Sequence, residues 1–307
     1  MRPLSEMTII QIEVTNACWL KCSNCTRHVG HHKNPFFMDL DFIEKAIDSL
    51  EGFEGNIGIM GGEPTLHPKF DEICAIVRKK IPRRKREFWT SGFQWAKKKD
   101  VILETWDKDR IAYNEHSTPG GKHTPLLVSI DEVVEDKKLM WQMIDNCWIQ
   151  SQWSASITPK GGFFCEVAAS LDYLLEGPGG YKIEKGWWKK NPNQFKDQVE
   201  RYCKNCSGAL PLPAESDGYG GRPNKENVNN YDTISKGMLE KLKSVKSQKV
   251  TAGHYKIYDK KYTIKDLEKY SENWEPSKFK PFVTHEPKDY DEKGPQRRVD
   301  HNKSGKI

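Results

Sequence analysis

The chain has 307 residues, of which 36% are hydrophobic and 30% are charged, and its net charge is +6. This size allows one large α/β domain, alone or with a smaller appendage, and disfavours two cores of equal size. No apolar run is long enough to cross a membrane and the first residues lack a secretory pattern, so we expect a cytoplasmic protein without a membrane partner. The basic run at residues 78–86 (RKKIPRRKR) is more typical of a solvated helix end than of a nucleic-acid footprint.

The first half of the chain alternates short apolar runs with amphipathic segments. Residues 8–14 (TIIQIEV) predict a buried strand, and residues 39–51 predict a helix for which Asp39 is a candidate N-cap. Such alternation predicts a parallel sheet with right-handed crossovers, so the fold class is α/β, as a full or a partial barrel. The further strands are expected at 56–60, 87–92, 110–114 and 126–130, and the further helices at 68–80, 94–104 and 135–145.

After residue 146 the pattern changes from β/α units to a smaller C-terminal extension. WSASITP and GGFFCEV flank a Lys-Gly-Gly turn and predict a β-hairpin. We assign residues 147–245 to this extension, with a helix near 234–244, and residues 246–307 to a peripheral segment. From residue 281 onward apolar periodicity is weak, which predicts a mobile tail or an arm on a partner.

The chain has eight cysteines, and its first residues show no export signal. This combination argues against a disulfide framework and for metal binding or catalysis. Cys18, Cys22 and Cys25 follow the first predicted strand with the spacing C-x-x-x-C-x-x-C. Three thiolates on one loop can hold three irons of a cubane and leave the fourth iron open for chemistry. A structural zinc site is the alternative, with a fourth ligand from His28, His31 or His32.

A second motif, GIMGGEPTLHP, follows the second predicted strand. Together, the triplet and the GGEP element resemble the radical SAM superfamily, whose members bind a 4Fe–4S cluster and S-adenosylmethionine (SAM). The resemblance covers about residues 8–145 and implies a partial (β/α)6 barrel of the TIM type over residues 1–146. It also implies that Gly61 and Gly62 let the backbone approach SAM, that Glu63 accepts from its ammonium group, and that Pro64 stiffens the turn.

Further SAM-binding residues are implied at the ends of later strands, where β/α enzymes assemble their sites. One residue departs from the family. Many members carry an aromatic residue just before the third cysteine, where it packs near the adenine, whereas this chain has Asn24. The SAM-binding residues that the resemblance implies at the ends of the later strands are Thr90, Ser91, Asn114, His116 and Ser129.

Four more cysteines lie in the C-terminal extension. Four thiolates are the number that a closed four-iron cluster or a structural zinc requires. Many radical SAM enzymes resemble this layout and hold an auxiliary cluster in such an extension; spacing alone does not choose among this cluster, zinc and unligated thiols. Cys74, in an apolar helical stretch, is expected to be buried and inert. The four cysteines are Cys147, Cys165, Cys203 and Cys206.

The resemblance implies an enzyme that reductively cleaves SAM to a 5′-deoxyadenosyl radical, with an electron from an external donor of the flavodoxin or ferredoxin type. The favoured substrate is a small polar compound (a sugar, nucleoside or amino acid), because the extension resembles those of radical SAM proteins found with sugar-tailoring enzymes. The basic excess and the aromatics keep a base in DNA or RNA as the second choice. A zinc-binding protein that interacts with nucleic acid is the alternative of another class. Candidate lid or packing groups are Trp148, Trp153, Trp187 and Trp188.

Overall fold

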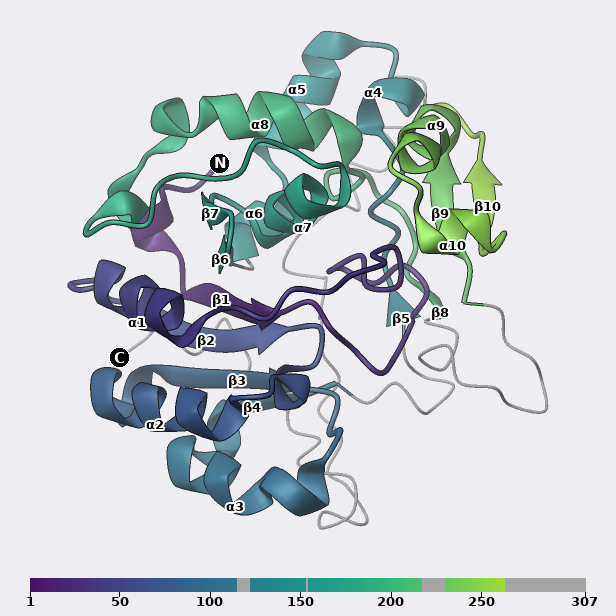
Figure 1. Ribbon diagram of the computed structural model, residues 1–307. Helices are drawn as coiled ribbons and strands as arrows, with labels where there is room; N and C mark the ends of the chain where they lie inside the picture. Colours follow the sequence, from purple (N-terminus) through teal and green to yellow (C-terminus); the bar gives the residue numbers. More distant parts are fainter. Residues whose placement is uncertain (115–121, 153, 217–229, 263–307) are drawn as a thin grey trace.

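The computed structural model describes residues 1–114, 122–152, 154–216 and 230–262. Its centre is a six-stranded sheet with the order β4-β3-β2-β1-β6-β7 (Figure 1). Neighbouring strands from β4 to β6 pair in parallel, and β7 pairs antiparallel with β6. Because β4 and β7 lie at opposite edges, the sheet is open, and the expected α/β fold with a partial barrel is confirmed.

The strands and helices have the following bounds. The main sheet contains β1 (Ile9–Thr15), β2 (Asn56–Gly61), β3 (Arg86–Thr90), β4 (Ile111–Tyr113), β6 (Ala155–Thr158) and β7 (Gly161–Phe163). The helices are α1 (Leu40–Ser49), α2 (Phe70–Lys80), α3 (Trp95–Thr105), α4 (Ile130–Val133), α5 (Lys137–Asp145), α6 (Trp148–Gln152), α7 (Glu166–Leu174), α8 (Lys196–Tyr202), α9 (Lys236–Ser244) and α10 (Gln248–Thr251). Two small sheets pair β5 (Lys122–His123) with β8 (Glu215–Ser216), and β9 (Asp232–Ser235) with β10 (Tyr255–Tyr258).

The two faces of β1 have different chemistry because side chains alternate along a strand. Ile10, Ile12 and Val14 belong to the main apolar core, which α1 also joins through Ile43 and Ile47. Full burial of each such aliphatic side chain stabilises the fold by roughly 1.5–3 kcal/mol. The opposite face of β1 therefore remains for the polar side chains of the strand.

The predicted elements of the first 125 residues are confirmed to within a few residues, but the strand expected at 126–130 is wrong. Leu127 makes only a one-residue bridge to Ile234 of β9, and helix α4 begins at Ile130. The apolar run belongs to the main core, but its one β-bridge is to a segment about a hundred residues later and not to the main sheet. Local periodicity does not carry that information.

The expected hairpin is confirmed as β6 and β7, and β6 also pairs with β1. The main sheet therefore continues across residue 146, where the sequence suggested a separate extension. The helix expected near 234–244 is confirmed as α9. The tail expected from residue 281 onward lies outside the described residues.

The described tryptophans of the extension are packing groups. The indole N–H of Trp187 donates to Ser49 Oγ, and that of Trp188 donates to the Ser49 carbonyl at the end of α1. Trp148 is also buried, whereas Trp153 lies outside the described residues. Among the described residues, no helix is both long and apolar enough to cross a membrane.

Candidate active site and metal centres

The cysteine triplet occupies the loop that leaves the carboxyl end of β1. Cys22 is buried, and Cys18 and Cys25 are half-buried. Burial raises the pKa of Cys18, and the neighbouring Glu63 carboxylate raises it further. Burial likewise raises the pKa of Cys25. These groups are neutral thiols in the metal-free protein, so a metal that binds them must displace their protons.

The GGEP turn at the end of β2 lies directly against this loop. Gly62 N donates to Thr15 O at 2.8 Å, and Glu63 N donates to Ala17 O at 2.7 Å. A Cβ at Gly62 would lie 2.3 Å from the Ala17 carbonyl oxygen. At Gly61, which has a φ of +154°, it would lie 1.9 Å from Thr15 O. The close approach expected toward SAM is therefore seen toward the loop that carries Cys18.

Glu63 joins the ends of β2 and β3. Its buried carboxylate accepts from the hydroxyls of Thr65, Thr90 and Ser91 and from the backbone N–H of Ser91 at 2.7 Å. Burial raises the pKa of Glu63, and these hydrogen bonds oppose the rise. Both oxygens already have donors, so the ammonium of a bound SAM would share or displace them. Trp19 of the cysteine loop completes the contact by donating to Ser91 Oγ at 2.8 Å.

The other residues expected at the SAM site have different surroundings. Pro64 is buried and begins the turn after Glu63. Asn114 N donates to Thr90 O at 2.8 Å, which brings Asn114 to the same end of the sheet. Ser129 precedes α4 and its N–H donates to Ser235 Oγ, so the expectation that it ends a strand of the main sheet is wrong. His116 lies outside the described residues.

A buried charge cluster on the polar face of β1 was missed by the sequence analysis. Arg27, two positions after Cys25, pairs with Glu166 of α7 at 2.6 Å and lies 3.6 Å from Glu13 of β1. Ser156 of β6 donates to Glu13 at 2.7 Å, and Arg27 also contacts the sulfur of Met60 beside the GGEP turn. Burial raises the pKa of Glu13, and the charge of Arg27 opposes the rise. The available signal was the alternation of Gln11 and Glu13 within an otherwise apolar strand.

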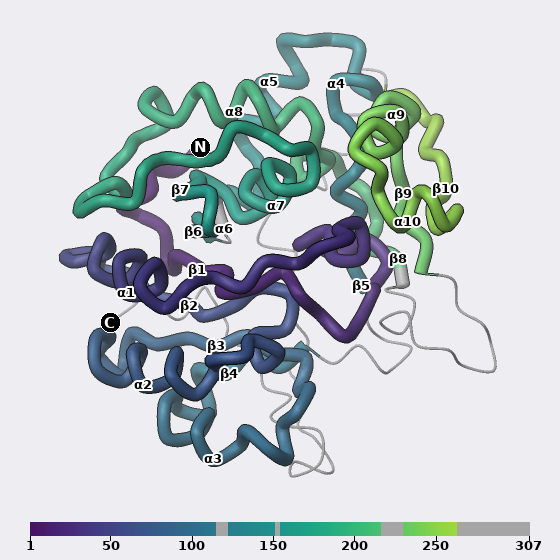
Figure 2. The backbone as a smooth tube through the Cα atoms, viewed as in Figure 1, coloured from purple at the N-terminus to yellow at the C-terminus, as the bar shows by residue number. Residues whose placement is uncertain are grey.

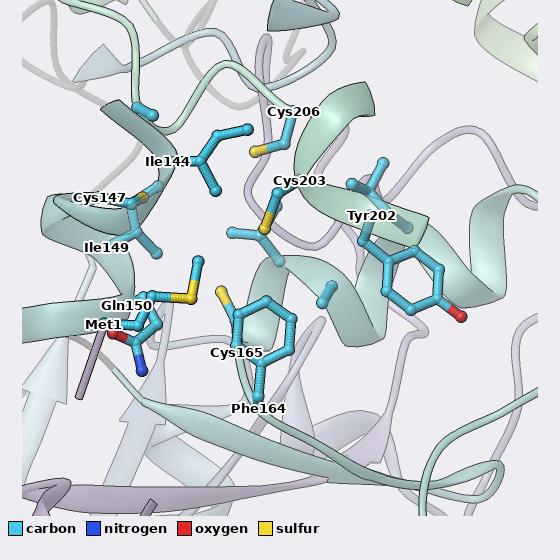
Figure 3. A pocket seen from close by; sticks show the side chains of 14 residues that line it. Met1, Ile144, Cys147, Ile149, Gln150, Phe164, Cys165, Tyr202, Cys203 and Cys206 are labelled. Atoms are coloured by element: carbon cyan, nitrogen blue, oxygen red, sulfur yellow. The ribbon is translucent and has the colours of Figure 1, made fainter. Parts of the chain in front are cut away.

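The second cysteine set lines one small cavity of about 30 Å³ (Figure 3). Cys147 precedes α6, Cys165 is the N-cap of α7, and Cys203 and Cys206 lie in the turn after α8. Figure 3 shows their four sulfur atoms facing the same space. Burial raises the pKa of Cys165 to about 12, with a further contribution from Cys147.

The donor chemistry of this cavity fits a closed cluster or a structural zinc, since four thiols surround it and its other lining is mainly apolar. Gly208 leaves room between two of the sulfurs, because a Cβ there would lie 3.4 Å from Cys206 Sγ and 3.5 Å from Cys147 Sγ. Its N–H donates to Cys206 Sγ at 3.2 Å. In the described part of the chain, no three Cys, His, Asp or Glu side chains already have a metal-binding arrangement, so cysteine side chains must rotate to bind either group.

Comparison with known proteins bears on the first of the two sites. Residues 12–138, which contain the triplet and the GGEP turn, match the radical SAM superfamily. This part of the chain is similar to a radical SAM domain. Enzymes of this class bind a 4Fe–4S cluster and SAM, and the three cysteines of the triplet loop, which bind iron as thiolates, fit the first of these groups.

Two solved structures are similar to this chain, each at 19% identity. One is BtrN in complex with AdoMet and 2-DOIA, which has a TM-score of 0.44 and covers 65% of this chain and 92% of its own. The other is selenomethionine BtrN in an open conformation, which has a TM-score of 0.40 and covers 67% of this chain and 90% of its own. A search of curated proteins found no match.

Proposed function

We propose that Cys18, Cys22 and Cys25 hold a four-iron cluster with SAM at its open iron, and that the enzyme abstracts hydrogen from a small polar substrate. When bound, the cluster supplies the electron, received from a flavodoxin or ferredoxin type of donor, that cleaves SAM to a 5′-deoxyadenosyl radical. The contacts of the GGEP turn with the cysteine loop support this assignment. They hold Glu63 beside Cys18, where its carboxylate can accept from the ammonium of SAM.

The substrate class is supported by the charge cluster of Glu13, Arg27 and Glu166, which is the observation that carries this part of the proposal. All three side chains are at most 7% exposed, and they lie between the cysteine loop, β1 and α7. Arg27 Nε has no hydrogen-bond partner among the described residues. Buried charges and an unpaired donor favour a ligand with its own hydroxyl, amino or carboxylate groups, such as a sugar, nucleoside or amino acid.

A base within DNA or RNA is the second candidate and has less support. The basic run at 78–86 makes contacts within the chain. Arg86 donates to three carbonyls, Arg83 pairs with Asp107 at 2.7 Å, and Lys80 pairs with Asp48 at 2.8 Å. These contacts stabilise the end of α2 and the start of β3, and they reduce the charge available for phosphate contacts.

For the second cysteine set we propose an auxiliary four-iron cluster ahead of a structural zinc. The N–H donated by Gly208 to Cys206 Sγ supports this choice, because hydrogen bonds to the sulfur ligands tune such clusters. The alternative is that zinc occupies both this cavity and the triplet, in a protein that interacts with nucleic acid. Iron content distinguishes the two readings.

Anaerobic reconstitution tests the proposed function. We expect a brown protein with about eight irons per chain, whose absorbance bleaches with dithionite and which releases 5′-deoxyadenosine from SAM. A colourless, zinc-loaded protein without that product would reject it. Sugars, nucleosides and amino acids would then be compared with RNA and DNA oligonucleotides for faster 5′-deoxyadenosine formation; acceleration by oligonucleotides alone would replace the favoured substrate class by the second.

A further inference from the structure

The last described segment of the chain packs against the loop that carries the triplet. We call residues 230–254 the clamp. Figure 2 shows this yellow-green part of the chain beside the purple loop after β1. Asn24 in the loop and Asp232 in the clamp are 208 positions apart and are hydrogen-bonded at 2.6 Å. The clamp lies outside the residues that match the family, which end at 138.

The clamp donates hydrogen bonds to backbone carbonyls of the cysteine loop between Lys21 and His31. Asn230 Nδ2 donates to Lys21 O at 2.9 Å, and Lys249 Nζ donates to Cys22 O at 2.7 Å. Gln248 N donates to His31 O at 3.1 Å. Buried carbonyls need such partners, since an unpaired one costs about 1–3 kcal/mol. The path of the loop from 21 to 31 is therefore held by groups of the clamp as well as by its own turns.

Asp232 is the centre of these contacts. Its carboxylate accepts from Asn24 N at 2.6 Å, from His31 Nε2 at 2.6 Å and from Lys249 Nζ at 2.7 Å. The side chains of Asp232 and Lys249 are each only 2% exposed. The result is a buried ion pair in direct contact with the cysteine loop.

The clamp also explains the residue that departs from the family. Asn24 has a φ of +51°, in the left-handed region that asparagine tolerates better than most residues. Its Oδ1 accepts from Thr233 N at 2.9 Å, and its Nδ2 donates to Glu215 at 3.0 Å. A phenylalanine side chain could make neither bond, and no aromatic side chain has the amide group that makes both here. Asn24 faces the clamp, and here the position before the third cysteine serves to attach the loop.

We propose that Asp232 and Lys249 are positioning residues for the triplet loop, and that the Lys249 ammonium raises the reduction potential of the cluster bound there. The first half stands on the contacts in the metal-free protein, and the second half rests on the proposed function. Reduction adds negative charge to a cluster, so a buried cation beside Cys22 O favours the reduced form and a buried anion disfavours it. The two partners therefore act on the potential in opposite directions.

Four variants test this proposal: K249M, K249R, D232N and K160M. Lys160 is the matched control, since it pairs with the buried carboxylate of Asp172 and donates to the Gly177 carbonyl, away from the cysteine loop. In the metal-free protein, K249M and D232N should both accelerate amide hydrogen exchange in residues 18–31, while K249R stays near wild type and K160M leaves that segment unchanged. Loss of the clamp contacts should let this segment open more often, whereas loss of the Lys160 contacts should not.

The reduction potential of the triplet cluster can be measured by redox titration with electron paramagnetic resonance (EPR). It separates the effect of a changed charge from the effect of a more mobile cysteine loop. At one ambient potential, K249M should lower the ratio of reduced to oxidised cluster about tenfold, a shift of about 59 mV for one electron, and D232N should raise it. Potentials that move together in the two variants would overturn the electrostatic half. Unchanged exchange in both would overturn the positioning half. A wild-type chain that binds no iron would reject the proposed function and the electrostatic half, while the exchange data still decide the first half.

Discussion

Cys18, Cys22 and Cys25 lie in a single loop after one strand. The other four cysteines come from three helical segments that only the fold brings together. The triplet lies among polar partners: Glu63 on one side and the Asp232–Lys249 pair on the other. The four-cysteine cavity is lined mainly by apolar groups such as Ile149, Phe164 and Ala209.

This difference has chemical consequences. Three ligands on an iron cluster leave one coordination position for a substrate, and polar surroundings can bind a charged ligand there. Four ligands in an apolar cavity close the coordination sphere and keep water out, which suits electron storage or structure. The two sets therefore differ in ligand number, in how they are assembled and in what they expose.

The largest effect is expected from Cys22→Ala. Loss of one triplet ligand should lower the rate of 5′-deoxyadenosine formation by at least about a thousandfold, equivalent to about 4 kcal/mol, because SAM no longer meets an intact cluster. Product would be measured by chromatography after dithionite reduction. Cys74→Ala is the control, because Cys74 is fully buried in α2 and belongs to neither set. A Cys22→Ala enzyme with near wild-type turnover would refute the role of the triplet.

Replacing both Cys203 and Cys206 by alanine should halve the iron content from about eight to about four per chain and leave cleavage of SAM in the absence of substrate detectable. The variant should also unfold at a lower temperature than wild type, because the bound group contributes its binding free energy to folding. Iron would be assayed alongside thermal unfolding under anaerobic conditions. Unchanged iron would mean that this cavity holds no iron cluster.

Two glycine variants compare the two sites without removing a cysteine. Gly62→Ala should push the GGEP turn away from Ala17 O and destabilise the protein by about 1–3 kcal/mol, with weaker SAM binding. Gly208→Ala should affect the second set alone, because its Cβ would meet Ile149 Cδ1 at 2.7 Å beside Cys147 and Cys206. SAM affinity by calorimetry and unfolding in urea would separate them. Equal loss of SAM affinity in both variants would show that the two sites are not independent.

The smallest effect on SAM cleavage is expected at Glu87, which contacts Asn56 and Arg110 and neither cysteine set. Burial raises the pKa of Glu87 to about 7, against an ordinary value of 4.5. The folded state therefore holds a proton that the unfolded state releases between these values, so stability falls as pH rises from about 4.5 to 7. Glu87→Gln should remove about 3 kcal/mol of that decline, as measured by urea unfolding of the metal-free protein at pH 5 and 8. Parallel pH profiles would contradict the raised pKa.

The triplet site could be predicted from the sequence because the residues that form it are close together in the chain. The cysteine spacing, the GGEP turn and the strands before them are each set by residues close together in the chain, and the structure brings Glu63, Thr90 and Ser91 together as expected. For the other four cysteines the sequence indicated the residue types and a possible common site, but not the cavity that they line. Tertiary contacts determine it.

The partners of the cysteine loop were out of reach for the same reason. Asp232, Ser247 and Lys249 lie in segments with no motif, and their role depends on 200 or more positions of intervening chain. The misassigned strand at 126–130 has a related cause, since Leu127 bridges to Ile234 of β9 and not to the main sheet. Periodicity reports that a residue is buried, not by what.

The most direct test of the difference between the two sites is the response of each cluster to SAM. EPR spectra of the reduced protein would be recorded with and without SAM in a Cys203→Ala/Cys206→Ala variant and in a Cys18→Ala/Cys22→Ala/Cys25→Ala variant. SAM should change the spectrum of the first, which keeps the open triplet cluster, and leave the second unchanged. A spectral change in the second variant, or none in the first, would contradict the assignment of the open site to Cys18, Cys22 and Cys25.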